Sequence, residues 1–170
     1  MNTCSFCDQK KNLLTCCQCS CAVCKKCAEI LLEETFQYSN SVVFDENKVI
    51  YCRRCFDQHI EPKLLQYNEI LEKAKDVNVY FYQQAKETQF MSKSQPPLKV
   101  NDCTDRNEAI MKLAFMAAEK GFNGLIQVQV KEEKVRMGSY QTQKFHAVGI
   151  PTNIKASEII KSRSFWTDPN

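Results

Sequence analysis

The chain has 170 residues and a formal net charge of +3, with 44% hydrophobic and 25% charged residues. This composition excludes a chain that is disordered throughout, and the small net charge gives no indication of nucleic-acid binding. No apolar run approaches the roughly 18 residues that span a bilayer, and no signal-peptide core is visible at the start, so we expect an intracellular, cytoplasmic protein.

Cysteine dominates the first third of the sequence: ten of the 11 cysteines lie at or before Cys55, and the last is Cys103. Eight of them form four Cys-x2-Cys pairs, which are Cys4 and Cys7, Cys16 and Cys19, Cys24 and Cys27, and Cys52 and Cys55. A short turn of this kind brings two thiolates to one metal ion, at about 2.3 Å each for zinc. A disulfide framework would need a secreted chain, and one catalytic thiol would not require such a cluster. The sequence therefore predicts two structural Zn²⁺ ions.

The order of these pairs resembles the cross-brace treble-clef zinc fingers of the FYVE and PHD families. Residues 13–16 and 23–27 are similar to the PHD-type finger of the ADD domain, and residues 49–56 are similar to the close of a FYVE domain. In those families the first and third pairs share one ion, and the second and fourth pairs share the other. The resemblance thus implies one site of Cys4, Cys7, Cys24 and Cys27, and a second site of Cys16, Cys19, Cys52 and Cys55.

A RING finger fits the same region with one ligand changed, because Cys21 then replaces Cys16. Two features favour the FYVE/PHD register. A RING normally has Pro after its seventh ligand, where this chain has Arg53, and the 24-residue gap before the last pair is long for a RING. Cys17 is interpreted as a small core residue, and so is whichever of Cys16 and Cys21 is not a ligand.

The charges of the finger bear on what it binds. The basic run by which FYVE domains hold phosphatidylinositol 3-phosphate is absent, since Leu14 and Thr15 precede the third cysteine. Residues 1–60 carry seven basic and seven acidic side chains, and each zinc with four thiolates adds about −2. This balance disfavours membrane phosphoinositides and nucleic acid. We expect a non-enzymatic module that docks a protein partner; the alternatives are a RING-type E3 ubiquitin ligase and a FYVE-like phosphoinositide-binding module recruited to membranes.

The finger is expected to occupy residues 1–58. A helix is predicted from about residue 56 to residue 76, with Pro62 in its first turn, and residues 59–76 link the finger to a second, C-terminal domain. His59 is expected at the start of this helix, on the surface.

Residues 77–154 are predicted to form this small α+β domain, in which one helix covers an antiparallel sheet. β-branched and aromatic residues predict a strand over residues 77–82, and a Ser- and Pro-containing stretch then predicts a loop. Asp105 and Glu108 have capping-box spacing at the start of a helix, and Gly121 is placed to end it.

A hairpin is predicted after this helix. Ile126, Val128 and Val130 alternate with glutamines, which is typical of a half-exposed strand. A turn at Gly138 and a second strand over residues 140–150 complete the order strand, helix, strand, strand. Residues 155–170 are a tail without an assigned role.

Residues 117–126 resemble a glycine-containing motif of the bacterial YbjQ-like family, and residues 146–151 fall where that family has its final strand. The family is small, β-rich and oligomer-forming, and it is associated with heavy metals. The resemblance implies a homo-oligomer formed through the C-terminal domain.

No enzyme motif is visible, because the sequence lacks a Gly-rich phosphate loop, paired carboxylates and His-x3-His spacing. His146 is expected on a sheet face. Cys103 precedes a helix and is expected to be a small buried residue.

Overall fold

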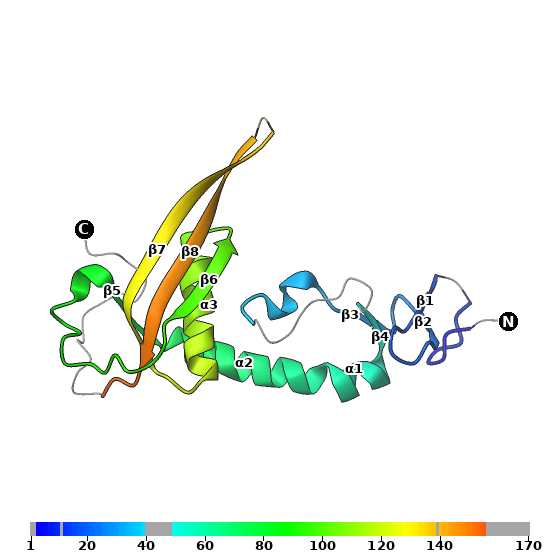
Figure 1. Ribbon diagram of the computed structural model, residues 1–170. Coiled ribbons are helices and arrows are strands. Elements are labelled where there is room, and N and C mark those ends of the chain that lie inside the picture. The colour runs from blue at the N-terminus through cyan, green and yellow to red at the C-terminus, as the bar shows by residue number, and fades with distance from the viewer. Residues whose placement is uncertain (1–2, 11, 40–48, 139, 156–170) are drawn as a thin grey trace. The chain divides into compact units, whose positions relative to one another are not determined.

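The computed structural model describes residues 3–10, 12–39, 49–138 and 140–155 (Figure 1). The chain divides into two compact units, Met1–Asn68 and Glu69–Asn170. The helices and strands of these units confirm the predicted α+β class. Across the described ranges, no helix combines the length and the apolarity that a membrane span requires. Nearly all of the predicted tail lies outside the described residues.

The first unit is built from two small antiparallel hairpins. Its elements are β1 (Leu13–Thr15), β2 (Ala22–Cys24), β3 (Ala28–Ile30), the 3-10 helix η1 (Glu33–Phe36), β4 (Ile50–Cys52) and α1 (Arg53–His59). β1 pairs with β2, and β3 pairs with β4. Among the described residues of this unit, the large buried apolar and aromatic side chains are those of Val23, Leu31, Phe36, Tyr51, Ile60 and Tyr67. Phe36 packs edge-on against Tyr67 with ring centroids 5.3 Å apart. Apolar burial in a unit of this size gives marginal stability.

The predicted single helix over residues 56–76 is instead two helices, α1 and α2 (Glu61–Lys75), which divide at Ile60. Pro62 explains the division, because a proline lacks the N–H that would continue the helix and its ring clashes with the carbonyl four residues earlier. The predicted position of His59 was therefore wrong, because this residue ends α1 rather than beginning a helix. Its predicted exposure at the surface is confirmed.

The second unit contains a four-stranded sheet in the order β5-β7-β8-β6. The strands are β5 (Asn78–Phe81), β6 (Leu98–Cys103), β7 (Gly124–Met137) and β8 (Tyr140–Thr152), and the 3-10 helix η2 (Tyr82–Gln84) follows β5. The sheet is mixed rather than wholly antiparallel as predicted, because β5 pairs with β7 in parallel. That orientation is available because a further strand and a helix lie between β5 and β7 in the chain.

Strand β6 was not predicted. The prolines before it indicated a loop, and the chain becomes extended directly after them, with Leu98 and Val100 buried. β6 pairs antiparallel with β8. Cys103 ends β6 and is fully buried, which confirms that it is a small core residue, and this burial raises the pKa of its thiol.

Helix α3 (Arg106–Glu119) has the predicted caps. The side chain of Asp105 accepts a hydrogen bond from the backbone N–H of Glu108 at 2.8 Å. The Glu108 carboxylate reaches back to the N–H of Thr104, at 2.7 Å. Gly121 adopts a positive φ of 80°, and the N–H of Phe122 donates to the helix carbonyl of Ala117 at 2.9 Å.

The sheet buries side chains on both faces. On one face α3 contributes the fully buried Leu113, and a Cβ added at Gly149 would come within 3.0 Å of Val128 and 3.7 Å of Leu113. A second cluster is made by Tyr80, Met91, Ile126 and Ile154. Its member Ile126 is only two positions from Val128 in the sequence. Such neighbours would share a face in a regular strand. A bulge at Gln127, with φ of 53°, breaks the predicted alternation and buries Ile126 and Val128 in different clusters.

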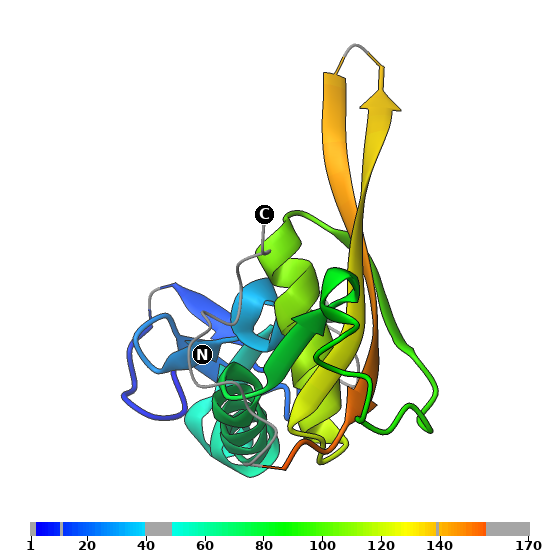
Figure 2. The same ribbon diagram turned by 90° about the vertical axis from the view of Figure 1, so that its left-hand side faces the viewer.

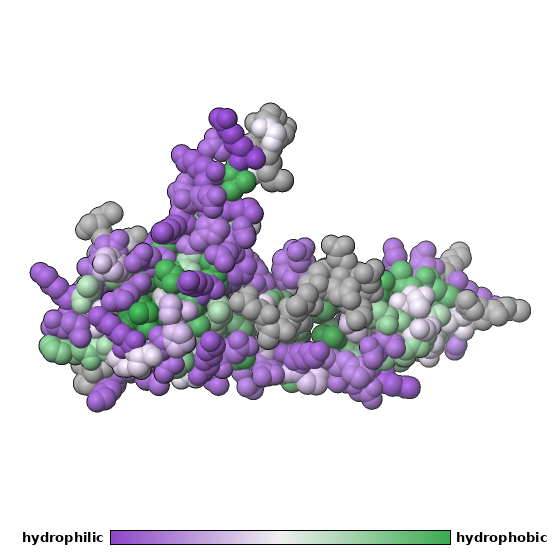
Figure 3. All heavy atoms as spheres, in the orientation of Figure 1, coloured by the Kyte–Doolittle hydropathy of each residue, from purple (hydrophilic) through white to green (hydrophobic). Residues whose placement is uncertain are grey.

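The hairpin of β7 and β8 extends beyond the rest of its sheet (Figure 2). Pairing with β5 ends at Val128, and pairing with β6 ends at Phe145, whereas β7 and β8 remain paired with each other as far as Met137 and Tyr140. We call residues 131–144 the arm. Its surface is mainly hydrophilic (Figure 3).

Candidate metal centre

Two tight turns in the first unit have the same backbone geometry. In the first, the N–H of Asp8 donates to the carbonyl of Cys4 at 3.0 Å; in the second, the N–H of Ser20 donates to the carbonyl of Cys16 at 2.9 Å. Asp8 and Ser20 have positive φ values of 58° and 60°. Each directly follows the second cysteine of its pair. The turn therefore doubles the chain back and places both thiols of the pair on one side.

Backbone amides point at the sulfur of the first cysteine in three of the pairs. The donors lie two and three positions further along the chain: Phe6 and Cys7 for Cys4, Gln18 and Cys19 for Cys16, and Lys26 and Cys27 for Cys24. Hydrogen bonds of this kind favour the thiolate, which is the form that binds metal. Because the same arrangement of N–H donors occurs at three of the pairs, these turns are suited to hold thiolates.

The first group of cysteines joins the initial turn to the end of β2 and the turn after it. The four Sγ atoms of Cys4, Cys7, Cys24 and Cys27 all lie within 4.8 Å of one another. Between Cys7 and Cys24 the Sγ atoms are 3.5 Å apart.

The second group joins the tip of the β1–β2 hairpin to the start of α1. It consists of Cys16, Cys19, Cys52 and Cys55, whose Sγ atoms also lie within 4.8 Å of one another. Cys52 is the last residue of β4 and Cys55 lies in the first turn of α1. The Sγ atoms of Cys19 and Cys52 are 3.8 Å apart.

These distances fit tetrahedral zinc. Four sulfurs at about 2.3 Å from one ion would lie about 3.8 Å from each other, close to the 3.5 Å and 3.8 Å seen here. A disulfide would need about 2.05 Å, and every cysteine is a free thiol. Sulfur ligands in this arrangement select zinc or iron over magnesium and calcium. Each group could hold one metal ion, and the donor set is compatible with zinc.

The thiols of the first group differ in acidity. The pKa of Cys4 is lowered to about 6, chiefly because the N–H of Cys24 donates to its sulfur. The pKa of Cys27 is raised to about 12, chiefly by hydrogen bonding with the Cys24 sulfur. Neighbouring thiolates repel one another, so they do not all ionise without a cation between them. A divalent cation bound between the sulfurs would offset the repulsion between the thiolates.

The structure brings Cys16 into the second group and leaves Cys21 outside it. The N–H of Cys16 donates to the carbonyl of Cys21 at 3.0 Å, so the two residues lie across the same turn. Burial raises the pKa of Cys21 to about 12, and the neighbouring sulfurs of Cys19 and Cys52 contribute to this rise. The other spare cysteine, Cys17, is half-buried rather than a full core residue.

Arg53 has a structural role in this region that the sequence did not predict. Its guanidinium forms ion pairs with Glu29 in β3 and Asp57 in α1, each at 2.9 Å. The hydrogen bond to Glu29 is the main reason that the pKa of Arg53 is raised. Arg53 therefore connects β3 to α1 beside Cys52. The sequence feature that could have revealed this role is the position of Arg53 directly after Cys52, a predicted metal ligand.

A groove of about 390 Å³ lies beside the second group of cysteines. Phe6 and Ser5 from the first turn form one wall, and Arg54, Gln58 and His59 from α1 contribute to the others. Phe6 is 43% exposed, which is high for an aromatic side chain. The structure therefore places Phe6 at the surface.

His146 lies in β8, as predicted, in the second unit. Its Nε2 is 3.1 Å from a carboxylate oxygen of Glu133, and its Nδ1 is 3.3 Å from the side-chain oxygen of Asn101. Neither cysteine group includes a histidine.

Comparison with known proteins gave no match to a family model, a curated protein or a solved structure. The FYVE/PHD and YbjQ-like resemblances therefore remain interpretations of short motifs.

Proposed function

We propose that the first unit is a two-zinc cross-brace finger of the FYVE/PHD type, with Cys4, Cys7, Cys24 and Cys27 holding one ion and Cys16, Cys19, Cys52 and Cys55 holding the other. The observation that carries this proposal is the interleaving of the two groups. The first group spans Cys4 to Cys27, and the second begins inside that span, at Cys16. Zinc bound in this way would fix the relative positions of both hairpins and α1.

The role proposed for this finger is to dock a protein partner. The groove beside the second group has the composition of such a surface, since an exposed aromatic ring, Phe6, lies near the polar side chains of Arg54 and Gln58. Aromatic side chains and Arg are the residues that most often carry binding energy at protein interfaces. The ions would act structurally, by holding this surface in shape.

The two alternative functions have less support. The RING register needs Cys21 as a ligand, and its sulfur lies outside the second group. A phosphoinositide site needs a basic cluster, whereas the groove contains one arginine, Arg54, among its lining residues.

The docking proposal is tested by comparing proteins captured from a cell lysate on the full chain and on two variants. Phe6→Ser removes the aromatic side chain from the groove, and Leu65→Ser is the matched control, because Leu65 is 61% exposed and is not among the residues lining the groove. We expect a partner that is retained by the wild type and by Leu65→Ser and is lost with Phe6→Ser. Zinc content is measured for each protein to show that the finger is intact. Identical captured sets for all three proteins would contradict docking at this groove.

A further inference from the structure

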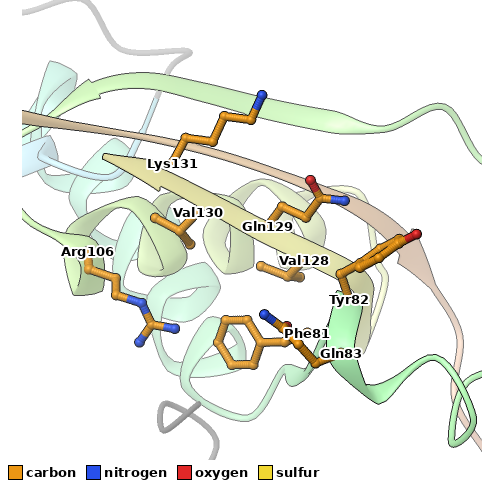
Figure 4. A pocket seen from close by; sticks show the side chains of 8 residues that line it. All are labelled: Phe81, Tyr82, Gln83, Arg106, Val128, Gln129, Val130 and Lys131. Atoms are coloured by element: carbon orange, nitrogen blue, oxygen red, sulfur yellow. The ribbon is translucent and has the colours of Figure 1, made fainter. Parts of the chain in front are cut away.

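A cavity of about 480 Å³ opens in the second unit, at the point where β5 ends beside β7 (Figure 4). Phe81 and Tyr82 line it from the end of β5 and η2, and Arg106 lines it from the first turn of α3. Val128 and Val130 of β7 form the remaining apolar wall. We call this cavity the notch.

The notch lies at the beginning of an open strand edge. β5 pairs with β7 only as far as the contact of Phe81 with Val128, and β7 continues to Met137. Within the part of the chain that the structure describes, no strand pairs with this edge of β7 beyond Val128. Backbone N–H and C=O groups along such an edge are able to pair with another extended chain.

The side chains around the notch supply cations on both faces of β7. Val128 and Val130 point to the same side as Arg106 and Phe81, whereas Lys131 points to the opposite side (Figure 4). The guanidinium carbon of Arg106 lies 5.0 Å from the centroid of the Phe81 ring. This stacking uses the face of the guanidinium, and its N–H donors lie in the plane of the group, where they suit a carboxylate.

The next part of β7, residues 131–136, also has a net positive charge. Residues 131–136 contain three basic side chains, Lys131, Lys134 and Arg136, and two acidic ones. One of the acids, Glu133, lies 3.1 Å from His146. With Arg106 at its start, the open edge is therefore positively charged and complements an acidic ligand.

We propose that the notch and the adjoining edge of β7 bind an extended acidic segment of a protein partner by strand addition. The backbone of this segment pairs with β7 beyond Val128. Because consecutive side chains of a strand point to opposite faces, two adjacent acidic residues reach two different cations. One carboxylate enters the notch and contacts Arg106 above Phe81, and the next contacts Lys131 on the other face.

The test is a fluorescence-anisotropy titration of the full chain with a labelled peptide, Val-Glu-Glu-Val-Glu-Glu. Two matched probes are the same peptide with Lys in place of Glu, and the Glu peptide with alternate backbone nitrogens methylated. We expect saturable binding of the Glu peptide that weakens with salt, and no binding of either other probe.

Variants locate the site. Arg106→Gln removes a charged hydrogen-bonding partner, so we expect the affinity for the Glu peptide to fall about tenfold. Lys131→Gln is expected to cause a smaller loss on the opposite face, and it tests the same proposal should Arg106→Gln disturb α3. Lys99→Gln is the matched control, because it removes one exposed positive charge from β6, which forms the other edge of the sheet, and we expect a change of about twofold or less.

Three results of the peptide titrations would overturn the proposal. The first is equal affinity for the Glu and Lys peptides, the second is undiminished binding of the methylated peptide, and the third is unchanged affinity in both Arg106→Gln and Lys131→Gln. Sedimentation of the protein alone tests whether a second copy occupies the edge instead. A dimer that forms through β7 and excludes the Glu peptide would also overturn it.

Discussion

The two units of this chain are stabilised by different means. In the described part of the first unit, each strand is three residues long, and eight cysteines gather in two groups of four. In the second unit, strands of 14 and 13 residues pack with α3, which fully buries Ile110 and Leu113. The comparison supports our proposal that metal stabilises the first unit, whereas an apolar core stabilises the second.

Typical free energies of apolar burial and of zinc binding support this difference between the two units. Burial of one large aliphatic side chain contributes about 1.5–3 kcal/mol, so a sheet with many such residues needs no metal. Structural zinc contributes an apparent 10–16 kcal/mol or so in small fingers, which is several times the contribution of one buried side chain. Loss of an ion should therefore affect the two units very unequally.

The largest expected effect is that of Cys52→Ser. Cys52 connects β4 to α1 in the second cysteine group, so we expect the metal content to fall from two zinc ions per chain to one. The hairpins of the first unit should lose most of their protection from hydrogen exchange. Elemental analysis and exchange mass spectrometry measure the two effects. Cys103→Ala is the matched control, since Cys103 is a buried thiol outside both groups, and it should keep both ions. An unchanged zinc content in Cys52→Ser would contradict the assignment.

A smaller effect, confined to the second unit, is expected from Leu113→Ala. Leu113 is fully buried against the sheet, and its truncation leaves a cavity that costs about 2–5 kcal/mol of unfolding free energy. Urea unfolding followed by exchange in α3 and β7 measures this loss. The zinc content should stay at two ions. A simultaneous loss of zinc would show that the two units do not behave separately.

The smallest effect concerns the pH dependence of α3. Burial opposes ionisation of Glu108, but Lys112 and Thr104 together hold its pKa at about 2. Because this value is below that of an unfolded glutamate, about 4.3, the carboxylate stabilises the fold above pH 4.3 or so and loses that effect as the pH falls toward 2.

Glu108→Gln should therefore cost about 1 kcal/mol at neutral pH, and the difference from the wild type should vanish at low pH. Hydrogen exchange of the α3 amides at several pH values measures it. Lys75, whose ion pair with Glu72 is on an exposed helix surface, provides a control as Lys75→Gln, with little effect expected at any pH. A constant difference between Glu108→Gln and the wild type across this pH range would contradict the assigned role of the carboxylate.

The sequence predicted the thiol groups better than the sheet for a physical reason. Cysteine pairs at two-residue spacing have few chemical uses, so Cys4 and Cys7 could be interpreted from local sequence alone. The caps of α3 are also local, and Asp105 and Gly121 were predicted correctly. Ligation itself stays a prediction.

Features that depend on distant partners were missed. β6 was not predicted because its partner strand, β8, lies more than 40 residues away in the sequence. The two prolines before β6 indicated a loop, and the local sequence did not show where that loop ends. The parallel pairing of β5 with β7 is likewise a property of the sheet. The bulge at Gln127 was invisible because the alternating pattern around it is that of a regular strand.

Hydrogen exchange of the full chain, measured before and after zinc is removed with a chelator under reducing conditions, tests the central claim most directly. The account predicts that β1 to β4 and α1 lose protection, that α3 and the paired part of β7 and β8 keep theirs, and that re-addition of two equivalents of zinc restores the first unit. Unchanged protection of β1 to β4 in the zinc-free protein, or equal loss in both units, would contradict it.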